Sequence, residues 1–252
     1  MIICVKLILI TNLMIDLSII VINKNYLRYL KKCIQSCLEQ KTNYRYEIIV
    51  IDDGSKDGSA QYIKQIIDKK FSFIQSKSEG IEKASNKGFK KSKGRFVVRV
   101  DSDDYLHTNF IQTTISEIKK SKKDFVYSNY FQVDDKSNIK KKFFLPTFNK
   151  EEIISRGDFL ATGTVYRKGL IKNLKYYNER TKNSGLENYE LILKLLESNF
   201  EGKRINKFLF YYRKHKKNVS ILKKKKIISY GKKLFFKMNL EKYSKNQFHP
   251  WI

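Results

Sequence analysis

Apolar runs of strand length alternate with amphipathic helical patterns through the first half of the chain, and this order restricts the fold more than any other feature. The strand-like runs occupy residues 18–22, 46–51, 71–75 and 95–100, and the segments between them repeat apolar side chains at helical spacing. Strands that are apolar on both faces are typical of a parallel sheet with helices on each side. The sequence therefore predicts an α/β fold with a Rossmann-like, mostly parallel central sheet.

The second half of the chain has a less regular pattern. Residues 125–144 predict a β-hairpin with its turn at DDKSN, and residues 186–198 predict an amphipathic helix. Neither an internal repeat nor a proline-rich linker divides the chain before about residue 220. We therefore expect one domain over residues 1–220, followed by a basic helical tail over residues 221–252.

Two clusters of carboxylates follow predicted strands. Asp52 and Asp53 precede Gly54, and Asp101 and Asp103 belong to the stretch VDSDD. Ligands of such sheets bind beyond the carboxyl ends of the strands, so both clusters can line one crevice. Two aspartates separated by one residue can bind Mg²⁺ or Mn²⁺, which in turn binds phosphate oxygens. The alternative is that these aspartates only cap turns and helices.

Together the two clusters indicate a nucleotide-diphosphate site. A carboxylate of the first cluster can accept hydrogen bonds from a base or a ribose, and Gly54 permits a tight turn that a side chain would obstruct. Neither a P-loop nor a G-x-G-x-x-G motif is present in the sequence, so it supports neither an ATPase nor a dinucleotide-dependent enzyme.

The formal net charge is +27, and most of the basic residues are lysines spread along the chain. Nucleic-acid binding, attraction to an anionic membrane surface and solvated lysine are three explanations. Because the sequence contains no DNA-binding motif, we favour solvated lysine with some membrane attraction, and we expect no nucleic-acid partner. Cys33 and Cys37 lack further ligands for a zinc site, which predicts reduced thiols in a cytosolic protein.

The N-terminus is apolar but interrupted. Lys6 and Asp16 break the run before it reaches the roughly 20 uncharged residues that span a bilayer. Residues 1–13 are open to three readings, namely an extra strand, an interfacial anchor, or an upstream start before Met14.

Several segments, in their order along the chain, resemble family 2 glycosyltransferases. They are SIIVINKNYLRYL, YEIIVIDDGSKDGS and GIEKASNKGFKKSKGRFVVRVDSDDYL in the first half, and ATGTVYRKGLI, GLENYELILKLL and LFYYRKHKKNVS in the second. The resemblance covers about residues 16–220. It implies the GT-A fold and an inverting transfer from a nucleotide-diphosphate sugar, with a nucleotide half over about 16–106 and an acceptor half over about 107–220.

The resemblance also implies roles for individual residues. Asp101 and Asp103 would form the D-x-D motif, which contacts the ribose and a diphosphate bound to Mn²⁺ or Mg²⁺, so both are the candidate metal ligands. Arg213 and His215, in a segment similar to a Y-R-x-H motif, would lie on the diphosphate side. The nucleotide-binding residues would be Ile22, Asn23, Asn25, Asp52, Asp53, Gly54, Ser55, Asn86, Asp101, Ser102 and Asp103.

One departure from the family pattern concerns the general base. The acidic motif that usually reads E-D is Glu187 and Asn188 here. In the family, the aspartate is expected to take the proton from the acceptor hydroxyl. An amide has no useful basicity, so either Glu187 or Glu190 replaces the aspartate, or the chain is a weak catalyst. The catalytic candidates are therefore Glu187, Asn188 and Glu190.

The resemblance thus predicts a metal-dependent, inverting glycosyltransferase of the hexosyltransferase type. Its donor would be a UDP-sugar, and its acceptor a glycan or lipid-linked hydroxyl in surface polysaccharide synthesis. The basic tail would either lie on an anionic membrane or pack on the core, and we expect a cytoplasmic protein that in the first case is peripheral on the inner face of the plasma membrane. The rival hypotheses are a nucleotide-sugar-binding family member with weak or no catalysis, and a basic nucleic-acid-binding protein.

Overall fold

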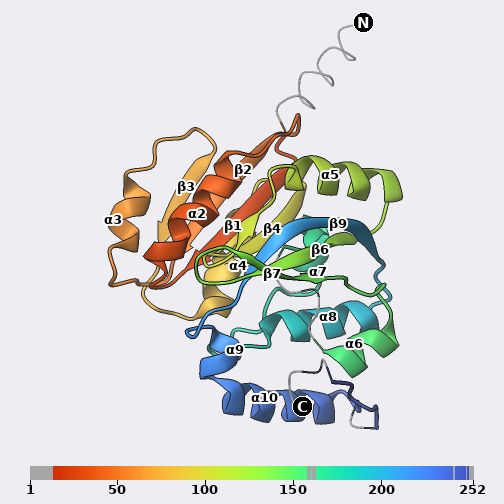
Figure 1. Cartoon of the computed structure of the whole chain (residues 1–252). Coiled ribbons are helices and arrows are strands. Elements are labelled where there is room, and N and C mark those ends of the chain that lie inside the picture. Colours follow the sequence, from red (N-terminus) through yellow and green to blue (C-terminus); the bar gives the residue numbers. More distant parts are fainter. Residues whose placement is uncertain (1–13, 158–159, 161–162, 241, 248, 250–252) are drawn as a thin grey trace, which may run out of the picture.

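A computed structural model describes residues 14–157, 160, 163–240, 242–247 and 249 of the chain (Figure 1). The predictions for residues 1–13 lie outside the described residues. The strands are β1 (Leu17–Asn23), β2 (Tyr46–Asp52), β3 (Phe71–Gln75), β4 (Phe96–Asp101), β5 (Tyr105–Leu106), β6 (Phe125–Val133), β7 (Ile139–Phe143), β8 (Val165–Arg167) and β9 (Gly202–Arg213). The helices are α2 (Leu27–Leu38), α3 (Ser59–Lys64), α4 (Ile81–Lys91), α5 (Phe110–Ser121), α6 (Lys150–Arg156), α7 (Lys168–Asn173), α8 (Glu187–Glu197), α9 (Val219–Leu222) and α10 (Lys224–Lys237).

These strands form one sheet in the order β3-β2-β1-β4-β8-β6-β9-β5, with β7 paired to β6 outside that path. The strands of the first half, β1 to β4, pair in parallel, as the sequence predicts. In the second half the sheet is mixed, because β8 runs antiparallel to both β4 and β6, whereas β6 and β9 are parallel. The hairpin predicted over residues 125–144 is the β6–β7 pair.

The register of the parallel strands brings the two carboxylate clusters to one edge. Asn23 at the end of β1 pairs with Asp52 of β2, and Ile22 pairs with Asp101 of β4. The ends of β1, β2 and β4 therefore lie side by side, which confirms the expectation that both clusters border one crevice. β1 is buried along its whole length, so its apolar side chains support the sheet from both faces.

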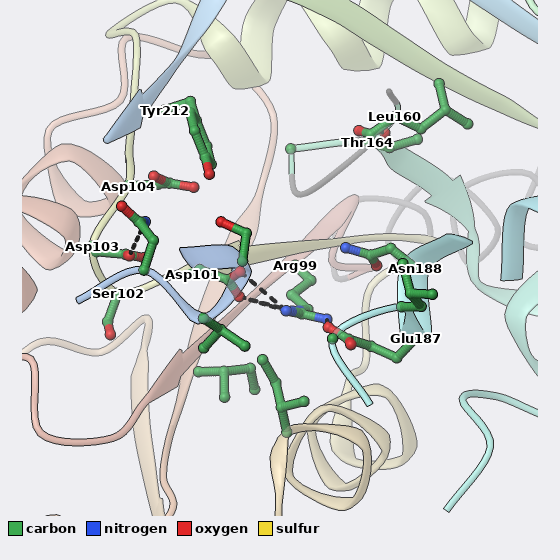
Figure 2. Close-up of a pocket in the computed structure, with 18 of the residues that line it drawn as sticks. Arg99, Asp101, Ser102, Asp103, Asp104, Leu160, Thr164, Glu187, Asn188 and Tyr212 are labelled. Carbon is green, nitrogen blue, oxygen red and sulfur yellow. Dashed lines mark hydrogen bonds and ion pairs between the residues drawn. The ribbon is translucent and has the colours of Figure 1, made fainter. Parts of the chain in front are cut away.

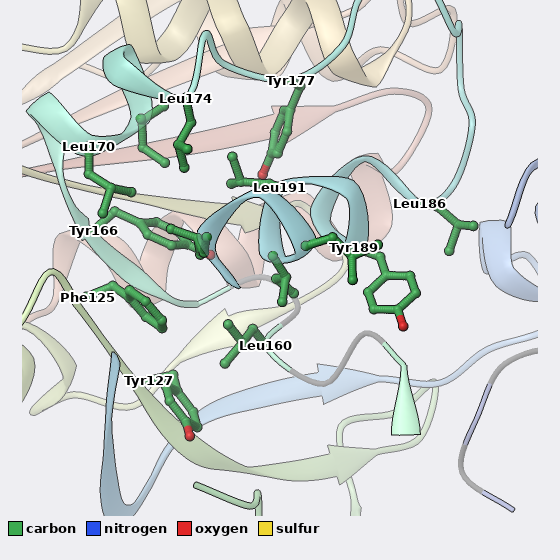
Figure 3. Packing of buried hydrophobic residues seen from close by; sticks show 14 of the residues in the cluster. Phe125, Tyr127, Leu160, Tyr166, Leu170, Leu174, Tyr177, Leu186, Tyr189 and Leu191 are labelled. Atoms are coloured by element: carbon green, nitrogen blue, oxygen red, sulfur yellow. The ribbon is translucent and has the colours of Figure 1, made fainter. Parts of the chain in front are cut away.

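Helices cover both faces of the sheet. On one face, α2, α3 and α5 pack on the strands through apolar side chains such as Leu30, Ile63 and Phe110. On the other face, α4, α6, α7, α8 and α10 enclose a larger apolar cluster (Figure 3). Leu191 of α8 lies within this second cluster, and Tyr166 and Phe125 approach it from the sheet.

The predicted helical tail is α10, and one face of it is part of the second apolar cluster. Ile227, Leu234 and Phe235 of α10 are buried in that cluster, at the spacing of a single helix face. Of the two readings of the tail, packing on the core therefore describes this face, and the opposite face remains in solvent. None of the described helices combines the length and the hydropathy that a membrane-spanning segment needs.

Candidate functional site

A cavity of about 590 Å³ opens at the carboxyl ends of β1 and β4, and α8, α9 and the start of α10 form its other side. Its wall joins side chains that lie far apart in the sequence, from Ile22 in β1 to Ile227 in α10. The sequence-predicted residues that line it are Ile22, Asp53, Asp101, Ser102, Asp103, Glu187 and Asn188.

Arg99 joins the first aspartate of the D-x-D motif to the start of α8 (Figure 2). Its Nε and Nη2 donate to the two carboxylate oxygens of Asp101 at 2.9 and 3.0 Å, and its Nη1 donates to Glu187 Oε1 at 2.9 Å. Burial raises the pKa of Asp101 to about 6 against the opposing effect of Arg99, and the carboxylates of Asp103 and Glu187 add to the rise. One guanidinium thus holds two carboxylates within a single buried group.

Of the two glutamates predicted as the base, Glu187 is the one that lines the cavity. Its side chain is buried, and Oε2 has no hydrogen-bond partner among the described residues, whereas Oε1 is bound to Arg99. Glu190 has a different position, because its oxygens accept from Asn178 Nδ2 at 3.2 Å and from the Tyr230 hydroxyl of α10 at 2.8 Å. Glu190 is not part of the cavity wall.

Asn188 also lines the cavity and is held by a tyrosine that sequence reasoning missed. Its Oδ1 accepts a hydrogen bond from the Tyr177 hydroxyl at 2.5 Å. Burial raises the pKa of Tyr177 above its usual value, so this hydroxyl stays protonated and remains a donor at neutral pH. Tyr177 directly follows Tyr176 in the loop before α8, and this pair of tyrosines carries no sequence signal for the contact.

Asp103, the second aspartate of the D-x-D motif, contacts the loop that follows β9. Its Oδ2 lies 3.1 Å from His215 Nε2 and 3.4 Å from Asn218 Nδ2. His215 Nδ1 accepts from the backbone N–H of Lys217, so the proton of a neutral ring is on Nε2 and is donated to Asp103. The imidazole also stacks on Tyr29 with ring centroids 4.9 Å apart.

Arg213 stabilises the turn that contains Asp103 and Asp104 through hydrogen bonds that involve backbone groups. Its own N–H donates to Asp104 Oδ1 at 2.8 Å, and its Nε donates to the carbonyl oxygen of Asp103 at 2.8 Å. The guanidinium is buried and lies 4.8 Å from the centre of the Tyr29 ring. Neither Arg213 nor His215 belongs to the cavity wall, so the diphosphate-side role of both residues stays a prediction.

The predicted residues at the ends of β1 and β2 mainly bind one another. Asn23 Nδ2 donates to Asp52 Oδ2 at 2.8 Å and to Ser55 Oγ at 3.1 Å. Asp52 Oδ1 accepts from the Ser55 backbone N–H, and the backbone N–H of Asn25 donates to Ser55 Oγ. Gly54 has φ +76°, a conformation that glycine adopts without strain. These contacts shape the turn rather than the cavity wall.

Asp53 and Asn86 anchor loops around the site. Asp53 accepts from the backbone N–H groups of Glu79 and Gly80 at 2.7 and 2.9 Å, and it also lines the cavity. The side-chain amide of Asn86 binds the backbone N–H and carbonyl of Tyr177 at 3.0 and 2.9 Å, outside the cavity wall. The nucleotide-binding role predicted for Asn86 therefore stays a prediction, and its observed contacts are structural.

Several cavity residues were not singled out from the sequence. Tyr26 follows β1, whereas Asn218, Lys223 and Lys224 come from the segment around α9. The two lysines belong to a basic run that looks like ordinary solvated surface in the sequence. Only the return of the chain over the sheet places them at the mouth of the cavity.

The donor groups at the D-x-D motif suit a metal that binds mainly to a phosphate ligand. No group of three or more His, Cys, Asp or Glu side chains in the described part of the chain is arranged to hold a metal alone. Asp103 lines the cavity, and its Oδ1 has no hydrogen-bond partner in the described ranges, whereas both oxygens of Asp101 are bound to Arg99. Mg²⁺ commonly uses one or two carboxylates together with substrate phosphates and waters, which fits this arrangement.

Comparison with known proteins identifies the family of the chain. The model of the family "Glycosyl transferase family 2" matches residues 18–175. WfaP of Escherichia coli, named as a UDP-Glc:alpha-D-GlcNAc-diphosphoundecaprenol beta-1,3-glucosyltransferase, is 29% identical over 220 residues, which are 84% of this chain and 82% of WfaP. Glycosyltransferase GlyA of Streptococcus pneumoniae is 26% identical over 222 residues, which are 81% of this chain and 31% of GlyA, so this chain spans about a third of that protein.

The fold is also that of a solved structure. The crystal structure of S. aureus TarS 1-349 in complex with UDP-GlcNAc superposes with a TM-score of 0.72 at 20% sequence identity, covering 89% of this chain and 66% of that one. The predicted GT-A architecture, a central sheet flanked by helices, is therefore confirmed. Because the family model matches more than half of the chain, in the segment that carries the D-x-D motif, the protein belongs to glycosyl transferase family 2.

Proposed function

We propose that the protein transfers a sugar from a nucleotide-diphosphate donor, of the UDP-sugar class, to a hydroxyl of a glycan or lipid-linked acceptor in surface polysaccharide synthesis. The observation that carries this proposal is the cavity itself, which is lined both by the D-x-D aspartates and by Glu187, whose Oε2 has no partner among the described residues. The printed names of the relatives support the substrate classes, since WfaP is named for UDP-Glc and a diphosphoundecaprenol acceptor, and TarS was crystallised with UDP-GlcNAc.

Asp103 is the residue that would hold Mn²⁺ or Mg²⁺ through its unpaired Oδ1, with Asp101 beside it. A bound metal would neutralise the charge that develops on the departing diphosphate. Arg99 keeps Asp101 and Glu187 in fixed positions through charge-assisted hydrogen bonds of 2.9 to 3.0 Å. His215 and Asn218 orient the Asp103 carboxylate from the other side.

Glu187 is the proposed general base. The acceptor oxygen forms its bond to the anomeric carbon while the bond from that carbon to the diphosphate oxygen breaks. In the same step Glu187 takes the hydroxyl proton, and the nucleoside diphosphate leaves. Attack from the face opposite the diphosphate inverts the configuration at the anomeric carbon.

The buried Cys33 and Cys37 thiols and the nucleotide-sugar donor support a cytoplasmic location as part of this proposal.

A second candidate function is nucleotide-sugar binding with little or no catalysis. It is favoured by Asn188, because the family's expected base is an aspartate and Asn188 lies in the cavity wall. This candidate predicts that the protein is stabilised by a nucleotide-sugar but does not turn it over.

The test of the proposal is thermal unfolding with UDP, other nucleoside diphosphates and UDP-sugars, each with and without Mn²⁺. We expect the melting temperature to rise with a uridine ligand in the presence of Mn²⁺, because a ligand that binds only the folded state stabilises it. Asp103→Asn should remove the part of the rise that depends on Mn²⁺. Asp68→Asn, in the loop before β3 and away from the cavity, is the matched control and should keep it.

The outcomes separate the two candidates. A shift followed by release of UDP in the presence of acceptor supports transfer, whereas a shift without turnover of any donor supports the binding function. A rise that is the same with and without Mn²⁺ contradicts the metal role of Asp103. If none of the nucleotides shifts the melting temperature, the nucleotide site itself is wrong.

A further inference from the structure

A surface on α9 and α10 combines exposed apolar side chains with lysines. Ile221 and Leu222 of α9 are 49% and 67% exposed, and Phe236 of α10 is 70% exposed. Exposed large apolar side chains that are grouped, as Ile221 and Leu222 are in the sequence, commonly mark an interaction site. The three side chains, together with Lys225, Lys232 and Lys233, are called the α9–α10 surface below.

The periodicity of α10 explains how this surface arises. Ile227 and Phe235 point into the apolar cluster, whereas Lys225, Lys232 and Phe236 follow the spacing of the opposite helix face. Phe236 therefore projects from the solvent side of α10 among lysines and does not pack on the apolar cluster beneath the helix. Figure 1 shows α10 along the bottom edge of the molecule, next to α9 and opposite α5.

The charge of this surface has one sign. From residue 202 to residue 240 the sequence contains no aspartate or glutamate, whereas lysine and arginine recur throughout. Within the described part of the chain, Lys225, Lys232 and Lys233 form no ion pair with a carboxylate. The surface therefore offers a ligand uncompensated positive charge next to apolar side chains, which is the composition of interfacial amphipathic helices.

The α9–α10 surface adjoins the mouth of the active-site cavity. Val219 and Lys223 line the cavity, and they flank Ile221 and Leu222 in the sequence. A single residue, Lys223, separates α9 from α10, so the exposed side chains at the start of α10 follow directly on those of α9, whereas Phe236 lies near the far end of α10. A partner bound to this stretch would lie beside the cavity opening.

We propose that the α9–α10 surface binds an anionic lipid bilayer and holds the cavity opening at the headgroup region. Ile221, Leu222 and Phe236 enter the boundary between headgroups and acyl chains, while the lysines contact lipid phosphates. Exposed aliphatic side chains favour a bilayer over nucleic acid, whose phosphate backbone is bound by charged and polar groups. That this position would bring the cavity near a lipid-linked acceptor rests on the proposed function, whereas bilayer binding itself does not depend on it.

The experiment is co-sedimentation of the full chain with vesicles of phosphatidylcholine alone and of an equimolar mixture with phosphatidylglycerol. We expect binding to the mixed vesicles only. The double variant Ile221→Ser with Leu222→Ser should weaken this binding by about tenfold or more, because the apolar contribution is lost. Ile67→Ser is the matched control, since Ile67 is 98% exposed in the loop after α3, and it should bind like the parent protein.

A second pair of variants tests the charge. Lys225→Glu with Lys232→Glu should weaken binding strongly, whereas Lys64→Glu with Lys69→Glu, an equal charge change near α3, should have a small effect. Equal losses in both pairs would overturn the proposal, because attraction would then follow the overall net charge. Unchanged binding of the Ile221 and Leu222 variant, or equal binding to both vesicle types, would overturn it as well.

The melting-temperature rise with UDP separates this proposal from the proposed function. If the Ile221 and Leu222 variant keeps the melting-temperature rise with UDP but the parent protein does not bind the mixed vesicles, only the bilayer-binding proposal is wrong. If mixed vesicles are bound and no nucleotide stabilises the protein, the surface is supported and the glycosyltransferase proposal is not. Binding of random-sequence DNA with higher affinity than vesicles would replace the lipid by nucleic acid as the partner.

Discussion

Arg99 holds the side chain of Glu187, the proposed general base, in position. It is buried in β4, and its guanidinium contacts Asp101 two residues away and Glu187 in α8. Because the buried guanidinium lies between two carboxylates, burying this group costs much less free energy than burying any one of the three charges alone. Arg99 binds only Oε1 of Glu187, and Oε2, which is buried without a partner among the described residues, is the oxygen that we propose takes the proton.

The role of Glu187 leads to the first prediction. Glu187→Gln should reduce the rate of sugar transfer by about two to four decades, because the amide keeps the contact with Arg99 but cannot take a proton. Nucleotide binding, measured by the melting-temperature shift, should stay the same. Glu190→Gln is the control, since Glu190 binds Tyr230 outside the cavity wall, and it should retain most of the activity. The reverse pattern would identify Glu190 as the base.

A second prediction concerns Asn188. Asn188→Asp should change the transfer rate by less than about threefold if Glu187 already serves as the base. The fold should tolerate this change, because an aspartate can accept the same hydrogen bond from the Tyr177 hydroxyl. A rise of about a hundredfold or more in steady-state transfer would show instead that the natural protein lacks its base, in favour of the binding-only function.

At the scale of elements, His249 illustrates how the C-terminal segment is fixed. The imidazole is buried, with its ring centroid 6.2 Å from that of Tyr189 in α8 and 5.8 Å from that of Phe235 in α10. Burial lowers the pKa of His249 to about 4, and the charge of Lys245 adds to the decrease. The neutral ring therefore belongs to the contact between the two helices.

This pKa gives a third prediction, on pH and stability. Since the folded protein holds His249 neutral down to a pKa of about 4, the unfolded chain, with a value of 6.5, binds more protons between these pH values. The free energy of unfolding should therefore fall as pH decreases from about 6.5 to about 4, by roughly 2 kcal/mol at pH 5 relative to pH 7. Urea unfolding at both pH values measures this loss.

The comparison with variants isolates the histidine. His249→Phe keeps an aromatic ring between α8 and α10 and should lose less stability on acidification than the parent protein. His107→Phe, which replaces a half-exposed ring in the loop after β5, should behave like the parent. If the pH dependence of His249→Phe equals that of the parent protein, the ring is not a source of the acid sensitivity.

At the scale of the whole molecule, α10 is a part of the structural core. Its residues Leu234 and Phe235 are buried in the same apolar cluster as Tyr189 and Leu191 of α8. The expected boundary at residue 220 stays a prediction, but a helix that shares its core with the acceptor half would unfold together with it.

The fourth prediction tests this cooperation. Phe235→Ala should lower the free energy of unfolding by about 3–5 kcal/mol, because a buried aromatic ring is removed and a cavity remains. Phe236→Ala, at the adjacent position with 70% exposure, is the matched control and should change it by less than about 0.5 kcal/mol. Equal effects, or a separate second transition in the Phe235 variant, would show that the tail is an independent unit.

The sequence by itself determined the parallel half of the sheet, the hairpin and the position of the carboxylates at the strand ends. Periodicity is a local property, and Ile22 and Asp101 become neighbours as soon as β1 and β4 pair in register. The order of short motifs was also enough to indicate the family, because motifs and their order are read along the chain without knowledge of how they are arranged in space.

Only the tertiary structure shows that Glu187 lines the cavity and Glu190 does not, and that one face of the basic tail packs on the core. Glu187 and Arg99 are 88 residues apart, and their contact depends on how α8 packs across the sheet. Likewise, α10 has an apolar face in either reading, and only its burial shows that this face belongs to the core. These questions concern which surfaces meet, and contacts between distant segments follow from the packing of the whole chain rather than from local patterns.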